Sequence, residues 1–174
     1  MVEDITAFQT PRIINGINNY VEKQGYAVIL NNMSLLEKTG NHYSELSSYQ
    51  SAISKSIKLF NKTQIDGLVY VAMHDRDVME LIPKLSIPIV LVYCYDTSKN
   101  NYYVTYDNVD VIVDVAECLM KRGNEKIGVI KGAEDSLPSQ KRLKSFITQL
   151  KKEGKELKEE YIFPGAWEFD DGVK

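Results

Sequence analysis

Apolar side chains recur at helical spacing near the start of the chain, at Ile13, Ile14, Ile17, Tyr20 and Val21. Thr10 stands just before them as a candidate N-cap, Pro11 suits a first helical position, and Gly25 suits a helix end. The pattern predicts a helix over about 11–24.

Short apolar runs and helical stripes then alternate along the chain. Strands are predicted at 26–30, 67–71, 87–93, 103–105, 126–130 and 161–163, and helices at about 43–61, 78–85, 109–122 and 143–150. Parallel strands need such crossovers, so the order predicts an α/β fold of open, doubly wound parallel sheets with helices on both faces. A longer polar join at 93–108 divides the series into two lobes, which we expect at 1–104 and 105–174.

Composition is that of a globular protein, with 44% hydrophobic and 26% charged residues among 174. Net charge is −3, and the one locally basic stretch, 151–158, also carries glutamates, so DNA binding by this chain alone is not expected. No signal peptide or membrane-spanning run is evident, which predicts a cytoplasmic protein. Cys94 and Cys118 lack metal or redox spacing and are expected to be buried free thiols, with no metal and no cofactor.

Motifs typical of catalysis do not occur: we find no GxGxxG, GK[ST], GxSxG or HExxH. His42 lies in a polar stretch. His74 and Asp75 follow a predicted strand and could form a base with its orienting carboxylate, but a pair that only lines the surface is the simpler interpretation, since no nucleophile accompanies it. The sequence therefore predicts a protein that is not an enzyme.

Polar segments follow the predicted strands. They lie at 31–33, 72–75, 93–96, 132–136 and 164–167, and are rich in amides, carboxylates, aromatic rings and glycine. In open parallel sheets, ligands bind beyond the carboxyl ends of the strands. These segments therefore predict a site for a small polar molecule.

Several short motifs occur in a familiar order along the whole chain. They are VEDIT at 2–6, PRIINGI at 11–17, GY at 25–26, DGL at 66–68, IPIVL at 87–91, DN at 107–108, GNEKIG at 123–128, RLKSF at 142–146 and GAW at 165–167. In this order and spacing the chain resembles the effector-binding domain of the lactose-repressor (LacI/GalR) family. Two departures are the segment 8–10, where many relatives have paired aromatics, and an insertion-like loop at 34–42.

The resemblance implies a fold of the periplasmic binding protein type I kind, with two Rossmann-like lobes and an effector cleft between them. It also implies that the chain begins inside the first strand, stops partway through an incomplete second lobe, and lacks the DNA-binding headpiece. In this family, effector binding favours one orientation of the lobes, and a homodimer transmits it to DNA through the headpieces.

Residue by residue, Arg142 matches an arginine that grips the polar groups of the effector, unless it is a solvated helix-surface side chain. Asp107 matches an acidic residue that accepts hydrogen bonds from ligand hydroxyls, and it also suits an N-cap for the next helix. Trp167 matches an aromatic side chain that stacks on the effector.

Further ligand contacts are expected from the first lobe, at Gln9, Thr10, Asn32 and His74. Ser136 and Pro138 are expected only to shape the wall of the effector site. The resemblance thus implies a bacterial transcriptional regulator that binds a small effector, with a carbohydrate favoured by hydroxyl-binding side chains. Two alternatives stay open: a solute-binding protein of a sugar transporter, and an enzyme that uses His74 and Asp75.

Overall fold

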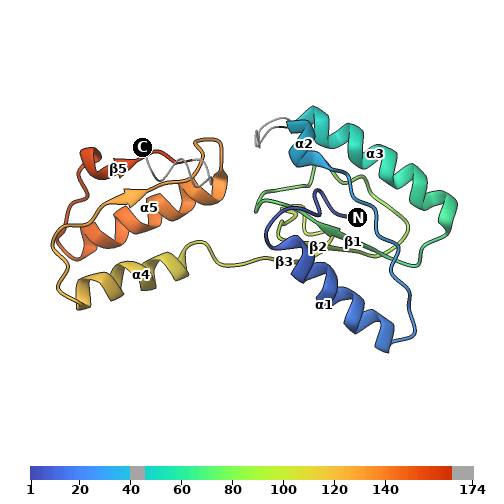
Figure 1. The fold of residues 1–174 in the computed structure, drawn as a ribbon, viewed down its shortest axis with the longest axis horizontal. Coiled ribbons are helices and arrows are strands. Elements are labelled where there is room, and N and C mark those ends of the chain that lie inside the picture. Colours follow the sequence, from blue (N-terminus) through green and yellow to red (C-terminus); the bar gives the residue numbers. More distant parts are fainter. Residues whose placement is uncertain (40–45, 166–174) are drawn as a thin grey trace. The chain divides into compact units, whose positions relative to one another are not determined.

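The computed structural model describes residues 1–39 and 46–165 (Figure 1). The chain divides into two compact units, which we call unit 1 (Met1–Thr105) and unit 2 (Tyr106–Lys174). Each has its own hydrophobic core.

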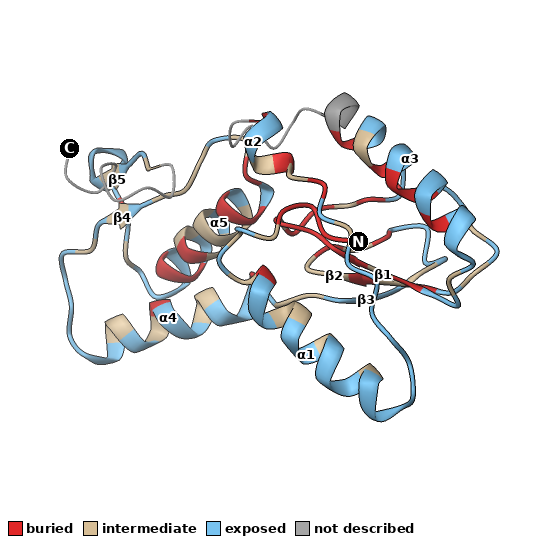
Figure 2. Cartoon of the chain, turned by 45° about the vertical axis from the view of Figure 1, so that its right-hand side comes forward, coloured by how far each residue is buried: buried red, intermediate tan, exposed pale blue. Residues whose placement is uncertain are grey.

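Unit 1 contains a parallel sheet among its described residues, in the order β1-β2-β3. Its elements are α1 (Thr10–Lys23), α2 (Leu35–Thr39), α3 (Leu46–Thr63), β1 (Leu68–Val71), β2 (Ile89–Val92) and β3 (Tyr102–Val104). Val69 pairs with Val90, and Leu91 pairs with Tyr103. The sheet lies between α1 on one side and α2 and α3 on the other (Figures 1 and 2).

The core of unit 1 forms between α3 and the sheet. Tyr49, Ile53 and Phe60 from α3 belong to one buried cluster with Tyr70 of β1 and Leu91 of β2. Figure 2 shows this burial along one face of α3, whereas α1 is mostly exposed. Because α3 carries its apolar residues at helical spacing, one face covers the sheet and the other meets water.

Unit 2 pairs two helices with a short parallel ladder. Its described elements are α4 (Asp110–Lys121), β4 (Val129–Ile130), α5 (Leu137–Lys152), the single turn η1 (Glu159–Tyr161) and β5 (Ile162–Phe163), and β4 pairs with β5. Ala116, Phe146 and Leu150 are buried where α4 packs against α5. Ser136 caps α5 by accepting a hydrogen bond from the backbone N–H of Ser139 at 3.3 Å.

Most of the predicted helices and strands are confirmed within a few residues at their ends, although α5 begins six residues before the predicted stretch 143–150. Gly25 and Gly123 follow α1 and α4 with positive φ of 81° and 75°, a conformation that favours glycine. The strands are parallel, and the sequence-based α/β expectation holds in both units.

The predicted strand at 26–30 is wrong. These residues form no ladder, and Tyr26, Ile29 and Leu30 are exposed. The chain start lies close to the end of this segment, where Val2 forms single β-bridges to Asn32 and to Val71. A strand is held by hydrogen bonds to a neighbouring strand, and within 1–39 and 46–165 this segment pairs with none.

The predicted helix around 78–85 is also wrong. The backbone N–H groups of Leu81 and Ile82 both bond to the carbonyl of Val78, which makes a single turn. Pro83 follows, and it has no N–H to continue a helix. Val78, Leu81 and Ile82 are nevertheless buried, so the apolar pattern marked core residues correctly but gave the wrong local structure.

Three smaller expectations are corrected as well. Part of the insertion-like loop at 34–42 is the helix α2, and Leu35 of this helix is fully buried in the core of unit 1. Thr10 is not an N-cap: it is the first residue of α1, and the N-cap residue Gln9 makes no capping hydrogen bond with its side chain. Cys94 is buried as expected, but Cys118 is exposed on α4.

Candidate functional site

The polar loops of unit 1 gather around the segment that follows β1. The Gln9 side chain reaches this segment, because its Nε2 donates to the carbonyl of Met73 at 3.0 Å. A carbonyl only accepts, so the amide nitrogen of Gln9 must face it and the amide oxygen Oε1 is directed elsewhere. Among the described residues, Gln9 Oε1 has no hydrogen-bond partner.

Glu3 lies at the centre of a buried polar cluster beneath this segment. One carboxylate oxygen, Oε2, accepts from the backbone N–H of Met73 at 2.8 Å. The other, Oε1, accepts from the hydroxyl of Tyr70 and forms an ion pair with Arg76. Glu3 is fully buried and Arg76 is 5% exposed. The cluster thus joins the chain start, β1 and the loop that follows it.

The guanidinium of Arg76 also lies over the ring of Tyr49, 3.8 Å from the ring centre. Its Nε and Nη1 atoms are buried without a hydrogen-bond partner among the described residues. Burial lowers the pKa of Arg76, but the Glu3 carboxylate together with Tyr70 and Tyr49 outweighs this effect, and the pKa is raised. Burial, followed by Glu3, raises the pKa of Tyr70 well above its ordinary value. The cluster therefore holds one fixed carboxylate–guanidinium pair.

The remaining sequence-predicted residues of unit 1 have varied environments. Asn32 is exposed, and its amide organises the local turn: Oδ1 accepts from the backbone of Ile5 at 3.0 Å, and Nδ2 donates to the Ser34 hydroxyl at 3.1 Å. Thr10 is buried, and its hydroxyl has no partner among the described residues. His74 is half-buried in the segment beside Met73.

Asp75, the proposed orienting partner of His74, is buried and accepts a hydrogen bond from the hydroxyl of Thr105 at 2.9 Å. This contact ties the segment after β1 to the segment after β3. The nearby thiol of Cys94 has a raised pKa, chiefly because it is buried.

In unit 2, Arg142 lies on the second turn of α5. Its Nε donates to Oδ1 of Asn108 at 2.8 Å, and its guanidinium carbon lies 5.3 Å from the ring centre of Tyr106. Its two Nη groups have no hydrogen-bond partner among the described residues. We call Tyr106, Asn108 and Arg142 the arginine cluster. It presents a fork of donors beside an aromatic ring.

Asp107 lies next to this cluster in sequence, but its exposed side chain serves α4. Oδ1 accepts from the backbone N–H of Val109 at 2.7 Å and of Asp110 at 3.0 Å. These hydrogen bonds, that of Asp110 first, lower the pKa of Asp107. Asp107 therefore caps the start of α4 with its carboxylate, although the N-cap residue itself is Val109, which makes no capping hydrogen bond with its side chain.

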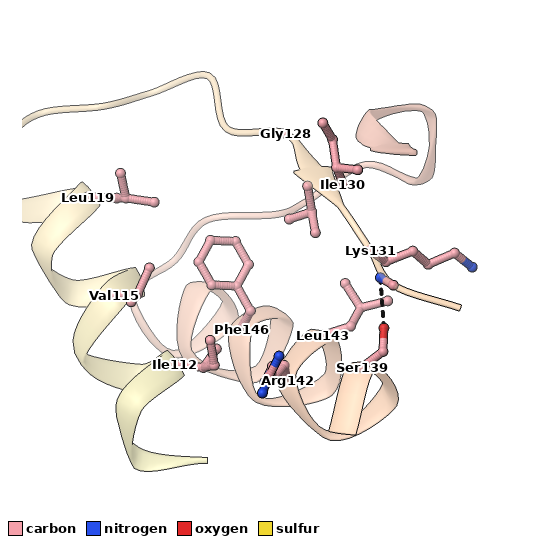
Figure 3. A pocket seen from close by; sticks show the side chains of 12 residues that line it. Ile112, Val115, Leu119, Gly128, Ile130, Lys131, Ser139, Arg142, Leu143 and Phe146 are labelled. Carbon is pink, nitrogen blue, oxygen red and sulfur yellow. Dashed lines mark hydrogen bonds between the residues drawn. The ribbon is translucent and has the colours of Figure 1, made fainter. Parts of the chain in front are cut away.

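An apolar groove of about 300 Å³ runs between α4, α5 and β4, and Arg142 stands at one end (Figure 3). Figure 3 shows Ile112, Val115 and Leu119 on α4 facing Phe146 on α5. At the polar end, the backbone N–H of Gly132 donates to the Ser139 hydroxyl at 2.9 Å. Ser139 and Arg142 thus bring two polar side chains from the start of α5 to a mostly apolar lining, to which Lys131 adds a third.

Trp167 and His42 lie outside the described residues. Sequence reasoning missed Glu3, Arg76, Tyr106 and Asn108. Glu3 and Arg76 are 73 positions apart in sequence, so no local pattern could pair them. Asn108, in contrast, belongs to the DN motif at 107–108 and could have been considered with Arg142.

Within the described ranges, no group of His, Cys, Asp and Glu side chains is arranged to hold a metal ion. No helix in the same part of the chain has the length and apolar character needed to cross a membrane.

Comparison with known proteins finds the same family along most of the chain. The family described as periplasmic binding proteins and sugar binding domain of LacI family matches residues 11–172. Catabolite control protein A from Priestia megaterium is 22% identical over all of this chain and 49% of its own length. The transcriptional repressor PurR from Mannheimia succiniciproducens is 24% identical over 98% of this chain and 48% of its own length. The chain thus spans about half the length of these curated relatives.

Solved structures show the same fold. A putative LacI-family regulator from Rhizobium etli matches 95% of this chain and 56% of its own, with 22% identity and a TM-score of 0.74. The complex of the regulator CelR with cellobiose matches 99% of this chain and 51% of its own, with 18% identity and a TM-score of 0.70. A periplasmic binding protein/LacI regulator from Alkaliphilus metalliredigens, complexed with D-xylulofuranose, matches 97% and 56%, with 17% identity and a TM-score of 0.68.

The parallel sheets, the polar loops at their carboxyl ends and the match over residues 11–172 agree with one another. This chain therefore belongs to the family that comprises the periplasmic binding proteins and the sugar-binding domains of LacI-type regulators.

Proposed function

We propose that the chain is the effector-sensing domain of a bacterial transcriptional regulator. It binds a small hydroxyl-rich molecule, a sugar or sugar derivative, and this binding controls the DNA affinity of the whole protein, which binds DNA through a separate headpiece and acts as a homodimer. Family membership supports the regulator class. The complexes of structural neighbours with cellobiose and D-xylulofuranose support the ligand class.

The observation that carries the proposal is the arginine cluster. The Nε of Arg142 is engaged by Asn108, which fixes the orientation of the guanidinium, while both Nη groups keep free donors among the described residues. A planar fork held in this way suits paired hydroxyls, and the neighbouring ring of Tyr106 suits the apolar face of a sugar. Gln9 offers an acceptor in unit 1 in addition.

The experiment is a thermal-shift panel of cellobiose, D-xylulose, D-ribose, D-glucose and adenosine, because a ligand that binds only the native state raises the melting temperature by mass action. We expect at least one sugar to raise it, and Arg142→Ala to abolish the shift. Loss of a charge-assisted hydrogen bond should weaken binding about tenfold or more.

Arg122→Ala is the matched control, since Arg122 is an exposed arginine in the same unit, at the C-cap of α4. It should leave the shift unchanged. If no sugar raises the melting temperature, or if Arg142→Ala responds as strongly as the parent, the proposal is wrong.

A further inference from the structure

The buried Glu3–Arg76 pair is not a surface ion pair. Among the described residues, each side chain forms its ion pair with the other, and both are almost fully removed from water. Burying two charges costs more than a comparable apolar contact, so stability alone is a weak reason for such a pair. The hydrogen bond from the Met73 backbone to Glu3 supplies another reason for the pair.

The pair acts on the loop after β1 through the Met73 peptide. Glu3 Oε2 holds the N–H of Met73, at 2.8 Å, while the carbonyl of the same residue accepts from Gln9, at 3.0 Å. Arg76 lies three residues further along and fixes the Glu3 carboxylate from the other side. The backbone N–H of Leu35 donates to the Glu3 carbonyl at 2.9 Å, and the N–H of Glu3 donates to the Val71 carbonyl at 3.0 Å, which fixes Glu3 itself.

We propose that Glu3 and Arg76 are positioning residues that, through Met73, fix Gln9 as a hydrogen-bond acceptor for the effector. This inference rests on the proposed function and adds one element of specificity to it. With Nε2 engaged by Met73, Gln9 Oε1 can only accept, so the ligand group that meets it must carry an O–H or N–H. A ligand that offers only acceptors at this position is disfavoured.

The test uses a paired substitution, Glu3→Leu with Arg76→Met. Removing both charges avoids an unpaired buried ion, so the variant should fold, as replacement of buried ion pairs by apolar side chains is often neutral for stability. We expect amide hydrogen exchange at Met73 to accelerate at least tenfold, while exchange at Leu91 of β2 is unchanged. We also expect about tenfold weaker binding of the panel sugar with the largest thermal shift, consistent with one lost hydrogen bond.

Glu160→Leu with Lys158→Met is the matched control, because it removes an exposed ion pair of 3.7 Å in unit 2. It should change neither readout. Gln9→Met gives a second route that leaves the buried cluster intact. It removes the acceptor without altering Glu3 or Arg76, and it should weaken binding of the same sugar to a similar extent while exchange at Leu91 stays as in the parent.

Unchanged exchange at Met73 in the paired variant overturns the inference whether or not any sugar binds, which separates it from failure of the proposed function. Accelerated exchange with the parent's affinity shows a purely structural role and overturns it as well. If the paired variant does not fold, Gln9→Met decides: binding equal to that of the parent contradicts the role given to Gln9.

Discussion

Gly165 lies against the backbone of a neighbouring strand in unit 2. A Cβ at this position would stand 2.7 Å from the carbonyl oxygen of Lys131 and 3.1 Å from the Cγ2 of Ile130. The first distance is too short for real atoms, and the obstacle is backbone, which cannot rotate away. The residue that begins the GAW motif thus has a packing reason to be glycine, independent of any ligand.

Gly165→Ala should therefore destabilise unit 2 by about 1–3 kcal/mol, the range for overpacking a well-filled site. Urea unfolding measures it. The same substitution at Gly16 is the control, because Gly16 lies inside α1 and a Cβ there would meet no atom within 4 Å. Gly16→Ala should stabilise by about 0.5–1 kcal/mol. Equal effects at the two positions would contradict the role of the Lys131 contact.

At the scale of elements, the chain itself predicts those that carry their own signals. α1, α4 and α5 have helical apolar stripes with glycine, proline or a serine cap near their ends, and all three form where expected. The stretch 78–85 has the stripe but contains Pro83, whose missing N–H was the stronger signal. The segment 26–30 has strand-forming residues, yet a strand depends on a partner elsewhere in the chain, which no local pattern shows.

The residues of the candidate sites likewise divide into those that a local motif reveals and those that depend on distant parts of the chain. Arg142 and Asp107 could be found from motifs, because each lies in a short run of residues that resembles the family's pattern. The capping role of Asp107 was also open to prediction, since its carboxylate precedes a helix by three residues. The cluster of Glu3, Tyr49 and Arg76 could not be predicted: it joins three distant segments, and its value depends on burial that only the fold creates.

The amides of the segment 26–30 should exchange with solvent at least tenfold faster than those of β1, because β1 is paired with β2 over four residues and Tyr26–Leu30 forms no ladder. Exchange followed by mass spectrometry measures both segments in one digest. Protection of 26–30 equal to that of β1 would mean that the segment has a partner in solution.

At the scale of the whole molecule, the two units differ in the size of their cores. Unit 1 buries a continuous cluster that includes Leu68 and Tyr70 of β1 and one face of α3. The buried core of unit 2 is smaller: among the described residues, its buried apolar side chains are Ala116, Phe146, Leu150 and Leu157. Small cores give little net stability, so unit 2 should tolerate less damage than unit 1.

Phe146→Ala tests this difference. Removing a buried aromatic side chain typically costs about 3–5 kcal/mol, which is close to the whole stability of a small core. We expect amide protection to be lost throughout α4 and α5 while β1 and β2 keep theirs. Leu91→Ala should have the converse pattern. Simultaneous loss in both units after either substitution would show that they unfold as one.

The two thiols offer a direct way to follow such events. The sequence contains two cysteines: Cys94, buried in unit 1 with a raised pKa, and Cys118, exposed in unit 2. Since the thiolate is the nucleophile that attacks an alkylating reagent, Cys118 should be labelled in the folded state, whereas Cys94 becomes reactive only after its surroundings open. At reagent concentrations where alkylation is faster than reclosing, the amount of the doubly labelled species over time therefore gives the opening rate of unit 1, with no engineered reporter.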